Sequence, residues 1–180
     1  MSTTDDWRAV VTARGKEAFV AAYPHPFLLA LSGLEAPHGP ARTIRMEGGA
    51  ELMNAILAER RRLKAEDKDK DKGPLVLPVK KVQTTFPSMI TVGRDKNNDI
   101  VVPDALVSKF HAFFRQLDDG EWGLADAGSA NGTRLGDAEL PPKGQPERVR
   151  SGDKIIFGGV SAFRFLESAA LWAALREPGR

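Results

Sequence analysis

The sequence contains no cysteine and only three histidines. It therefore has no disulfide framework, no thiol nucleophile and no cysteine metal site. No hydrophobic run approaches the roughly 20 residues that a membrane-spanning helix needs. The polar, acidic start lacks the basic residues and the apolar stretch of a secretory signal. We therefore expect a cytoplasmic protein with no membrane span.

The sequence also lacks an excess of positive or of negative charge. Lysine and arginine number 26 against 24 aspartates and glutamates, which gives a net charge of +2. The two signs stay nearly balanced in each part of the chain, whereas a surface that binds duplex nucleic acid usually carries a basic excess. We expect no nucleic-acid partner, although this balance still permits a single local anion site. A chain of 180 residues predicts one domain with appendages.

The first third of the sequence predicts a small α-helical region. Thr4 is a candidate helix cap, and an apolar stripe over 5–23 indicates a helix that ends at the following prolines. The short apolar run 27–31 fits either a buried strand or a helical turn, and its pattern does not decide between them. Glycine, proline and a basic pair predict a loop over 35–49. One apolar face predicts a second helix over 50–64.

A charged segment separates this region from the rest of the chain. Residues 65–74 alternate lysine with acidic residues and end in Gly-Pro, so we expect a solvated linker. The predicted order is a helical N-terminal region of open role (1–64), this linker, a β-rich domain (75–167) and a C-terminal helix (168–180). The first region shows no recognisable catalytic motif, so a catalytic region regulated by the β-rich domain is a weak alternative.

From Leu75 onward the hydrophobic pattern alternates, as in strands. Apolar runs bounded by turn residues cover 75–82, 88–92, 110–117, 121–126, 133–135, 138–140, 154–157 and 160–166, with a further strand at Ile100. Many short strands with turns every eight to twelve residues or so predict a β-sandwich or a barrel. Five aromatic residues are expected in its core: Phe113, Trp122, Phe157, Phe163 and Phe165.

Polar groups that suit an anion lie at the turns of this β-rich part. Arg94 follows Gly93 at the end of a strand, and its guanidinium matches the geometry of a phosphate. Ser108 and Lys109 follow a loop and add a hydroxyl and an ammonium group to an anion cradle. Asn131 lies in a turn, where its amide can hydrogen-bond the backbone of an extended peptide. These residues together predict a phosphate and peptide site.

Each of these residues also fits an ordinary role, as a solvated surface cation, a turn cap or a turn former. His111 is best explained as structural, because no second histidine or acidic cluster gives it metal-ligand spacing. Ser108 lies three positions away and points to the opposite face of a strand, which argues against a Ser/His hydrolase. We therefore expect no enzyme activity, no catalytic residue, no metal and no cofactor.

Taken together and in order, the motifs in residues 75–167 resemble the forkhead-associated (FHA) domain. The matching pieces are Gly93-Arg94, Asn98-Asp99-Ile100, Ser108-Lys109-Phe110-His111 and Asp126 through Asn131-Gly132-Thr133. The resemblance implies a mainly β fold, an FHA-type antiparallel β-sandwich, with the small helical N-terminal region and the C-terminal helix attached.

The resemblance also implies roles for the residues of the site. Arg94 and Ser108 would contact the phosphate with help from Lys109, and Asn131 would hold the backbone of the ligand. Structural support would come from Gly93, His111, Ser129, Gly132 and Thr133. The implied function is a phosphothreonine-peptide-binding adaptor in Ser/Thr kinase signalling. Its partner would be a phosphothreonine-containing protein, either a Ser/Thr protein kinase or its substrate.

Two positions depart from the family pattern. Position 109 is lysine, where many relatives have arginine and others asparagine. Position 130 is alanine, where relatives often place a hydroxyl residue that reaches the phosphate. One charge-assisted hydrogen bond of about 1.5–3 kcal/mol is then missing, unless Ser129 supplies it. Ala130 therefore also favours an alternative, a phospho-independent protein-interaction scaffold that uses the FHA-like sandwich.

Overall fold

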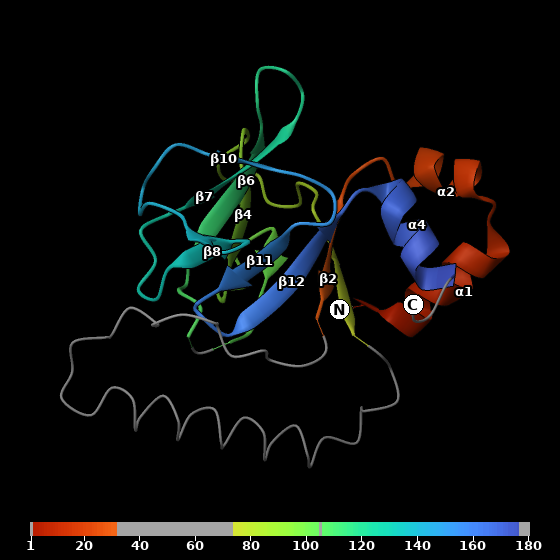
Figure 1. Ribbon diagram of the computed structural model, residues 1–180, viewed down its shortest axis with the longest axis horizontal. Coiled ribbons are helices and arrows are strands. Elements are labelled where there is room, and N and C mark those ends of the chain that lie inside the picture. Colours follow the sequence, from red (N-terminus) through yellow and green to blue (C-terminus); the bar gives the residue numbers. More distant parts are fainter. Residues whose placement is uncertain (1, 32–73, 105, 177–180) are drawn as a thin grey trace, which may run out of the picture.

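The structure is a computed structural model that describes residues 2–31, 74–104 and 106–176. Figure 1 shows a two-sheet β-structure with the helices gathered at one side. The helices are α1 (Thr4–Ala13), α2 (Lys16–Ala22) and α4 (Ser168–Arg176). The strands are β1 (Ser2–Thr3), β2 (Phe27–Ala30), β3 (Leu75–Pro78), β4 (Ile90–Gly93), β5 (Ile100–Val101), β6 (Ala112–Gln116), β7 (Trp122–Asp126), β8 (Thr133–Leu135), β9 (Ala138–Glu139), β10 (Glu147–Val149), β11 (Lys154–Phe157) and β12 (Ser161–Leu166).

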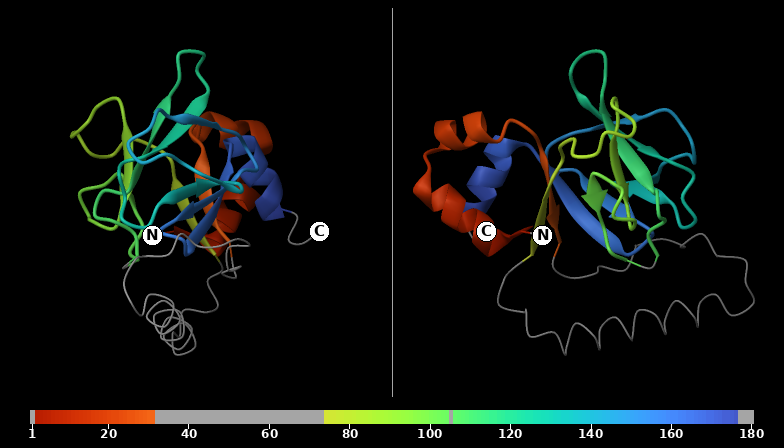
Figure 2. Two further views of the ribbon diagram at one scale, coloured as in Figure 1. Left: turned by 60° about the vertical axis from the view of Figure 1, so that its left-hand side comes forward. Right: turned by 180° about the vertical axis from the view of Figure 1, so that it is seen from behind.

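The strands form a sandwich of two sheets, which Figure 2 shows from two further sides. The larger sheet has the order β1-β3-β2-β12-β11-β8-β9, and the smaller one has the order β10-β7-β6-β4-β5. Neighbouring strands are antiparallel except for the pair β4 and β5. The predicted fold class, a β-sandwich with small N-terminal helices and a C-terminal helix, is confirmed.

The core between the sheets follows the alternation of each strand. On β6, Ala112 and Phe114 are buried while Phe113 is only partly buried. Phe114 stacks on Phe165 of the opposite sheet with 5.8 Å between ring centroids. Of the predicted core aromatics, the three on β11 and β12 are buried. Phe113 is partly buried, because it alternates with the inward-facing Ala112 and Phe114. Trp122 is partly buried at the start of β7 and packs against the core, on the same face as Leu124.

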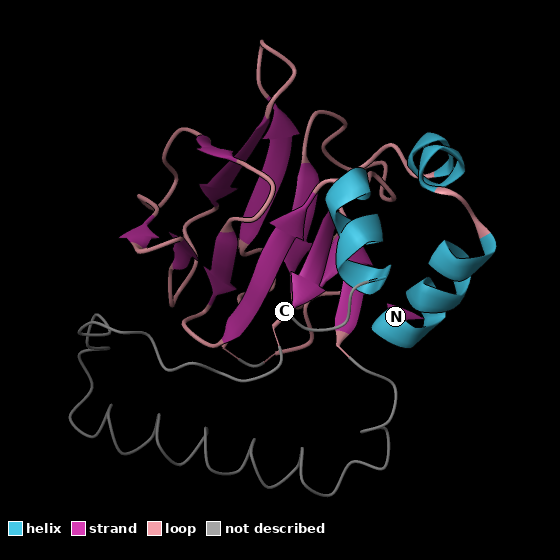
Figure 3. Ribbon diagram, turned by 45° about the vertical axis from the view of Figure 1, so that its right-hand side comes forward, coloured by secondary structure: helices cyan, strands magenta, loops and turns pink. Residues whose placement is uncertain are grey.

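The three helices cover the outer face of the larger sheet near β3, β2 and β12 (Figure 3). The burial of strand β2 explains this placement of the helices. Leu28 belongs to the core between the sheets, while Phe27 belongs to a second hydrophobic cluster, which it forms with the helices. In that cluster the ring of Trp7 meets Phe27 edge-on at 5.1 Å. Both faces of β2 are therefore buried, which is why its sequence is continuously apolar.

The predicted helix over 5–23 is two helices. Gly15 separates them with an extended backbone (φ −64°, ψ 160°), as its low helix propensity favours. Thr4 does not act as the predicted cap, because it is the first residue of α1 and its Oγ1 has no hydrogen-bond partner among the described residues. The undecided run 27–31 forms strand β2.

Strand β2 lies between β12 and β3, so residues 27–30 belong to the sandwich. For these residues, the expectation of an N-terminal region apart from the β-rich domain does not hold. The predicted loop 35–49, the predicted helix 50–64 and residues 65–73 of the predicted linker 65–74 lie outside the described residues. Among the residues that are described, no helix is long and apolar enough to cross a membrane.

Candidate functional site

Three loops meet at one end of the smaller sheet. The end of β4 lies beside the start of β6, where Val92 pairs with Ala112. The start of β6 lies beside the end of β7, where Ala112 pairs with Asp126. The loops 94–99, 102–111 and 127–132 therefore leave the sheet at the same end, opposite the β6–β7 turn. These loops carry all the residues that the sequence predicts to contact a ligand.

Backbone hydrogen bonds join the first two loops. The N–H of Arg94 donates to the carbonyl of Ser108 at 3.0 Å, and Nε of Arg94 donates to the carbonyl of Val107 at 3.1 Å. The side chain of Arg94 is thus oriented through Nε alone. Within the described part of the chain its two η nitrogens have no partner, and neither has Nζ of the exposed Lys109. Two cationic groups are left to bind an anion.

The third loop is tied to the second by side chains. The N–H of Ala130 donates to Oγ of Ser108 at 3.0 Å, so the hydroxyl proton of Ser108 remains to be donated to a ligand. Nδ2 of Asn131 donates to the carbonyl of Leu106 at 2.9 Å. Asn131 therefore bridges two loops, in addition to the backbone-holding role that the sequence predicts.

His111 is fully buried beneath these loops. Its Nδ1 accepts from the N–H of Ser108 at 2.9 Å, so the ring proton lies on Nε2, which donates to the carbonyl of Gly132 at 3.0 Å. The N–H of Gly158 also donates to the Gly132 carbonyl, at 3.0 Å. Burial lowers the pKa of His111. The neutral ring thus joins two loops, and it contacts the backbone of Ser108 rather than its hydroxyl.

Asp126 organises the third loop from the end of β7. Its Oδ1 accepts from the N–H of Gly128 at 2.7 Å and of Ser129 at 2.8 Å. Its Oδ2 accepts from the hydroxyls of Ser129 and Thr133, both at 2.6 Å. Burial acts to raise the pKa of Asp126, but these hydrogen bonds outweigh it and hold the pKa below its ordinary value. Because its hydroxyl is bound to Asp126, Ser129 does not supply the group that Ala130 lacks.

Two glycines permit the close approach of the loops. A Cβ at Gly93 would overlap the carbonyl oxygen of Lys109, so only glycine allows β4 and the second loop to lie this close. Gly132 has φ +74°, in the left-handed region that favours glycine. Asn98 also joins the first loop to the second, because its Nδ2 donates to the carbonyls of Asp95 at 2.8 Å and Lys109 at 2.6 Å.

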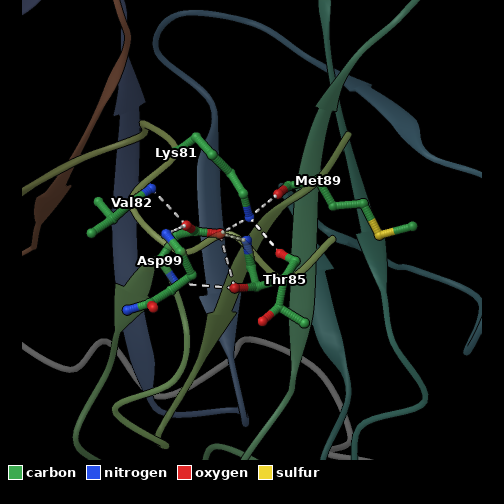
Figure 4. A network of polar contacts seen from close by, with 7 residues as sticks. Lys81, Val82, Thr85, Met89 and Asp99 are labelled. Carbon is green, nitrogen blue, oxygen red and sulfur yellow. Dashed lines mark hydrogen bonds and ion pairs between the residues drawn. The ribbon is translucent and has the colours of Figure 1, made fainter. Parts of the chain in front are cut away.

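An ion pair behind the first loop, between the partly exposed Lys81 and the buried side chain of Asp99, was not assigned a role from the sequence. Nζ of Lys81 donates to Oδ2 of Asp99 at 2.8 Å, and to the carbonyls of Thr85 and Met89 (Figure 4). The side chain of Asp99 has no exposed surface, and it also accepts from the N–H groups of Thr91, Val82 and Gln83.

The ionised state of Asp99 is strongly favoured. Burial alone would raise its pKa, but the ammonium of Lys81 and the backbone donors outweigh that cost and lower the pKa to about 2. The pair fixes the segment before β4 against the loop after it. The only sequence signal was the position of Asp99 inside the motif Asn98-Asp99-Ile100.

The arrangement can bind an anion together with an extended chain. It presents a guanidinium, an ammonium and a hydroxyl from adjacent loops, with an asparagine beside them. Among the described residues, no group of three histidines, aspartates or glutamates is placed to hold a metal ion. The site that the structure assembles is therefore one of donors and positive charge.

Comparison with known proteins gives two findings that bear on the family. The family model described as FHA domain matches residues 90–158. The FHA domain of an Arabidopsis thaliana hypothetical protein is 31% identical, and the match covers 52% of this chain and 74% of that chain, with a TM-score of 0.44. The chain belongs to the FHA family. None of the curated proteins that were compared matches it.

Two further FHA domains of known structure are less similar in sequence than the Arabidopsis domain. The N-terminal FHA domain of Rad53p from S. cerevisiae, solved with a phosphothreonine peptide, is 21% identical; the match covers 44% of this chain and 67% of that chain, with a TM-score of 0.39. The FHA domain of CT664 from Chlamydia trachomatis is 15% identical, with 79% of this chain and 97% of that chain covered and a TM-score of 0.47.

Proposed function

We propose that this protein is a phosphothreonine-peptide-binding adaptor in Ser/Thr kinase signalling. The observation that carries the proposal is the convergence of Arg94, Ser108 and Lys109 at one end of the sandwich, with donor groups that no described residue occupies. A phosphate dianion suits this set, because charge-assisted hydrogen bonds from a guanidinium are stronger than neutral ones. Membership of the FHA family supports the same ligand class, since the Rad53p domain was solved with a phosphothreonine peptide.

In this proposal each residue has one role. Arg94 and Ser108 bind the phosphate, Lys109 adds a flexible positive charge, and Asn131 holds the backbone of the peptide. His111 keeps the loops in place and takes no part in proton transfer, because both of its ring nitrogens face backbone groups. The protein would act by binding, without catalysis. The partner would be a phosphothreonine-containing protein such as a Ser/Thr kinase or its substrate.

The test compares a phosphothreonine peptide with its unphosphorylated twin by calorimetry on the full chain. We expect micromolar binding of the phosphorylated form, equivalent to about −8 kcal/mol. Arg94→Ala should weaken it by about 2–3 kcal/mol, or roughly thirty- to 150-fold, because it removes a charge-assisted contact. Ser108→Ala should cost less, because the lost donor is neutral.

Arg150→Ala is the matched control. Arg150 is an exposed arginine that follows β10 at the opposite end of the sheet, beside the β6–β7 turn. Its removal lowers the net charge by the same amount and should leave binding unchanged. Equal binding by folded Arg94→Ala and wild type would reject this site. Equal binding of both peptides would instead favour the phospho-independent scaffold, the alternative that the missing hydroxyl at Ala130 supports.

A further inference from the structure

A buried hydrogen bond joins the second loop to the opposite sheet. Asp104 lies early in the loop 102–111, and Ser161 is the first residue of strand β12 in the larger sheet. The hydroxyl of Ser161 donates to Oδ2 of Asp104 at 2.7 Å. Both residues are buried, with 8% of Asp104 and 7% of Ser161 exposed. None of the roles proposed above uses this contact.

Asp104 fixes two peptide groups further along the loop. Its Oδ1 accepts from the N–H of Leu106 at 3.1 Å, and its carbonyl accepts from the N–H of Val107 at 3.0 Å. The first contact is an Asx turn, which an aspartate can form within a loop without outside help. The hydrogen bond from Ser161 differs, because it fixes the same carboxylate against a strand of the other sheet. The larger sheet therefore sets the positions of these two peptide groups.

The carbonyls of the same two residues orient two side chains of the proposed site. Nδ2 of Asn131 donates to the carbonyl of Leu106 at 2.9 Å. Nε of Arg94 donates to the carbonyl of Val107 at 3.1 Å. Asn131 belongs to the third loop and Arg94 to the first, so adjacent carbonyls of the second loop serve both of its neighbours. A series of hydrogen bonds thus connects the larger sheet to both side chains.

The turn between β11 and β12 packs against the same part of the second loop. Gly158 in this turn lies so close to Leu106 that a Cβ there would overlap the Leu106 carbonyl oxygen. The N–H of Gly158 donates to the carbonyl of Gly132, the residue that follows Asn131. Since the turn leads directly into β12, it forms one support for the second and third loops together with the start of that strand.

Resting on the proposed function, we propose that Asp104 and Ser161 are positioning residues of the phosphopeptide site. They contact no ligand themselves; they hold the carbonyls that direct Asn131 toward the peptide backbone and Arg94 toward the phosphate. A guanidinium presents its donors in a fixed fork, and hydrogen bonds weaken steeply when their angle is poor. A small shift of the second loop therefore weakens ligand contacts made from both neighbouring loops.

The experiment measures the binding of a phosphothreonine peptide to the full chain by calorimetry. Ser161→Ala removes only the hydroxyl and should raise Kd about three- to tenfold, as the loss of one buried hydrogen bond predicts. Ser161→Thr keeps a hydroxyl and suits a strand, so it should restore binding. Ser151→Ala is the matched control. The hydroxyl of Ser151 accepts from the N–H of Glu167 at 3.1 Å, beyond the far end of β12, so its removal should leave Kd unchanged.

Asp104 offers a second pair of variants. Asp104→Ala removes both contacts of the carboxylate and should raise Kd about tenfold or more. Asp104→Asn keeps the shape and an acceptor for the N–H of Leu106, so it should retain most of the affinity. A role in stability alone would reduce the fraction of chains that bind and leave the Kd of the folded chains unchanged. A positioning role instead predicts a smaller effect of Ser161→Ala in Asn131→Ala or Arg94→Ala than in wild type.

A second measurement needs no ligand and separates this proposal from the proposed function. In NMR spectra of the full chain, the Nδ2 protons of Asn131 and the Nε proton of Arg94 should exchange with water faster in Ser161→Ala than in wild type or Ser151→Ala. A wild-type chain that binds no phosphothreonine peptide would reject the proposed function, and the role in binding would fall with it. The exchange rates would then still show whether Ser161 holds the two side chains.

Three results would overturn the positioning role while phosphate binding stays intact. The first is an unchanged Kd in folded Ser161→Ala and Asp104→Ala. The second is a loss of affinity that is as large in both Asn131→Ala and Arg94→Ala as in wild type. The third is unfolding of both alanine variants, because Asp104 and Ser161 would then hold the fold rather than the site.

Discussion

At the scale of single residues, His111 connects the chemistry of the site to its stability. Its neutral ring accepts from the N–H of Ser108 and donates to the carbonyl of Gly132, and burial lowers its pKa. A proton on Nδ1 would face the N–H of Ser108 and break that contact. The loops that carry the phosphate site are therefore held by a histidine that must stay neutral.

This predicts a pH dependence of stability. Because the pKa of His111 is lower in the folded state, the unfolded chain takes up the proton first as the pH falls. The free energy of unfolding should therefore decrease as the pH drops below about 6.5. His111→Gln should cost about 2–3 kcal/mol at pH 7.5, since it disturbs two buried hydrogen bonds, and should give a flatter profile between pH 7.5 and 5.

Urea unfolding at a series of pH values measures both effects. His25 is the control, because burial lowers its pKa as well but it lies away from the loops of the site. His25→Asn should remove only the part of the pH dependence of stability that His25 contributes, and it should leave peptide binding unchanged. A profile for His111→Gln that is as steep as that of wild type would contradict a neutral, buried His111.

The Lys81–Asp99 pair predicts a second transition at lower pH. Asp99 has a folded-state pKa of about 2, below that of an unfolded aspartate, so its stabilisation is present above pH 4 and is lost as the pH falls toward 2. The loss should amount to about 2 kcal/mol. Asp99→Asn should be destabilised by about 1–3 kcal/mol at pH 7, because the backbone donors and Lys81, whose side chain is 30% exposed, would lose their charged partner.

Acid unfolding of wild type and Asp99→Asn tests this, with Lys81→Met/Asp99→Asn as the matched double variant. The double variant should recover part of the lost stability, because it no longer holds an unpaired ammonium group at this partly buried position. If Asp99→Asn loses as much stability between pH 4 and pH 2 as wild type does, Asp99 is not the group whose protonation causes that loss.

At the scale of elements, the sequence predicted best those strands that are bounded by clear turn residues. The strands Thr133–Leu135 and Lys154–Phe157 were predicted with the bounds that the structure has. Strand β10 was missed, because two of its three residues are exposed and charged and leave no alternation to detect. Strand β2 stayed undecided, because burial on both faces removes the period that distinguishes strand from helix.

The same limit applies to the candidate site. The sequence order located Arg94, Ser108, Asn131 and His111, which the structure brings together. It did not show that Ser129 is bound to Asp126, because such a contact depends on how the third loop folds back. Nor did it indicate the stacking of Phe86 on Phe110, since those residues lie 24 positions apart and meet only in the fold.

At the scale of the whole molecule, the N-terminal residues complete the sandwich. Strand β2 pairs on one side with β12 and on the other with β3, and it contributes to both hydrophobic clusters. A fragment that begins at residue 74 would lack this strand and the helices α1 and α2. Contrary to a boundary at the linker, we expect that fragment to be unfolded, because it would expose the apolar edges of β3 and β12.

The register of β2 and β3 predicts which segment the fold does not need. Leu29 pairs with Val76 and Phe27 with Pro78, so the two strands are antiparallel neighbours. A four-residue turn containing glycine is long enough to join such strands as a hairpin. We therefore expect a variant in which this turn replaces residues 32–73 to fold, and to bind the phosphothreonine peptide as wild type does.

Circular dichroism, thermal unfolding and calorimetry on this shortened chain give the measurement. Its matched control is the chain that lacks residues 1–31 but retains 32–180, which should not show a cooperative transition. The two deletions remove segments of the same half of the sequence, and the deletion of residues 1–31 removes β1 and β2 from the larger sheet. A folded chain without residues 1–31 would show that the sandwich does not need β2. A shortened chain that fails to fold would show that the fold needs residues 32–73.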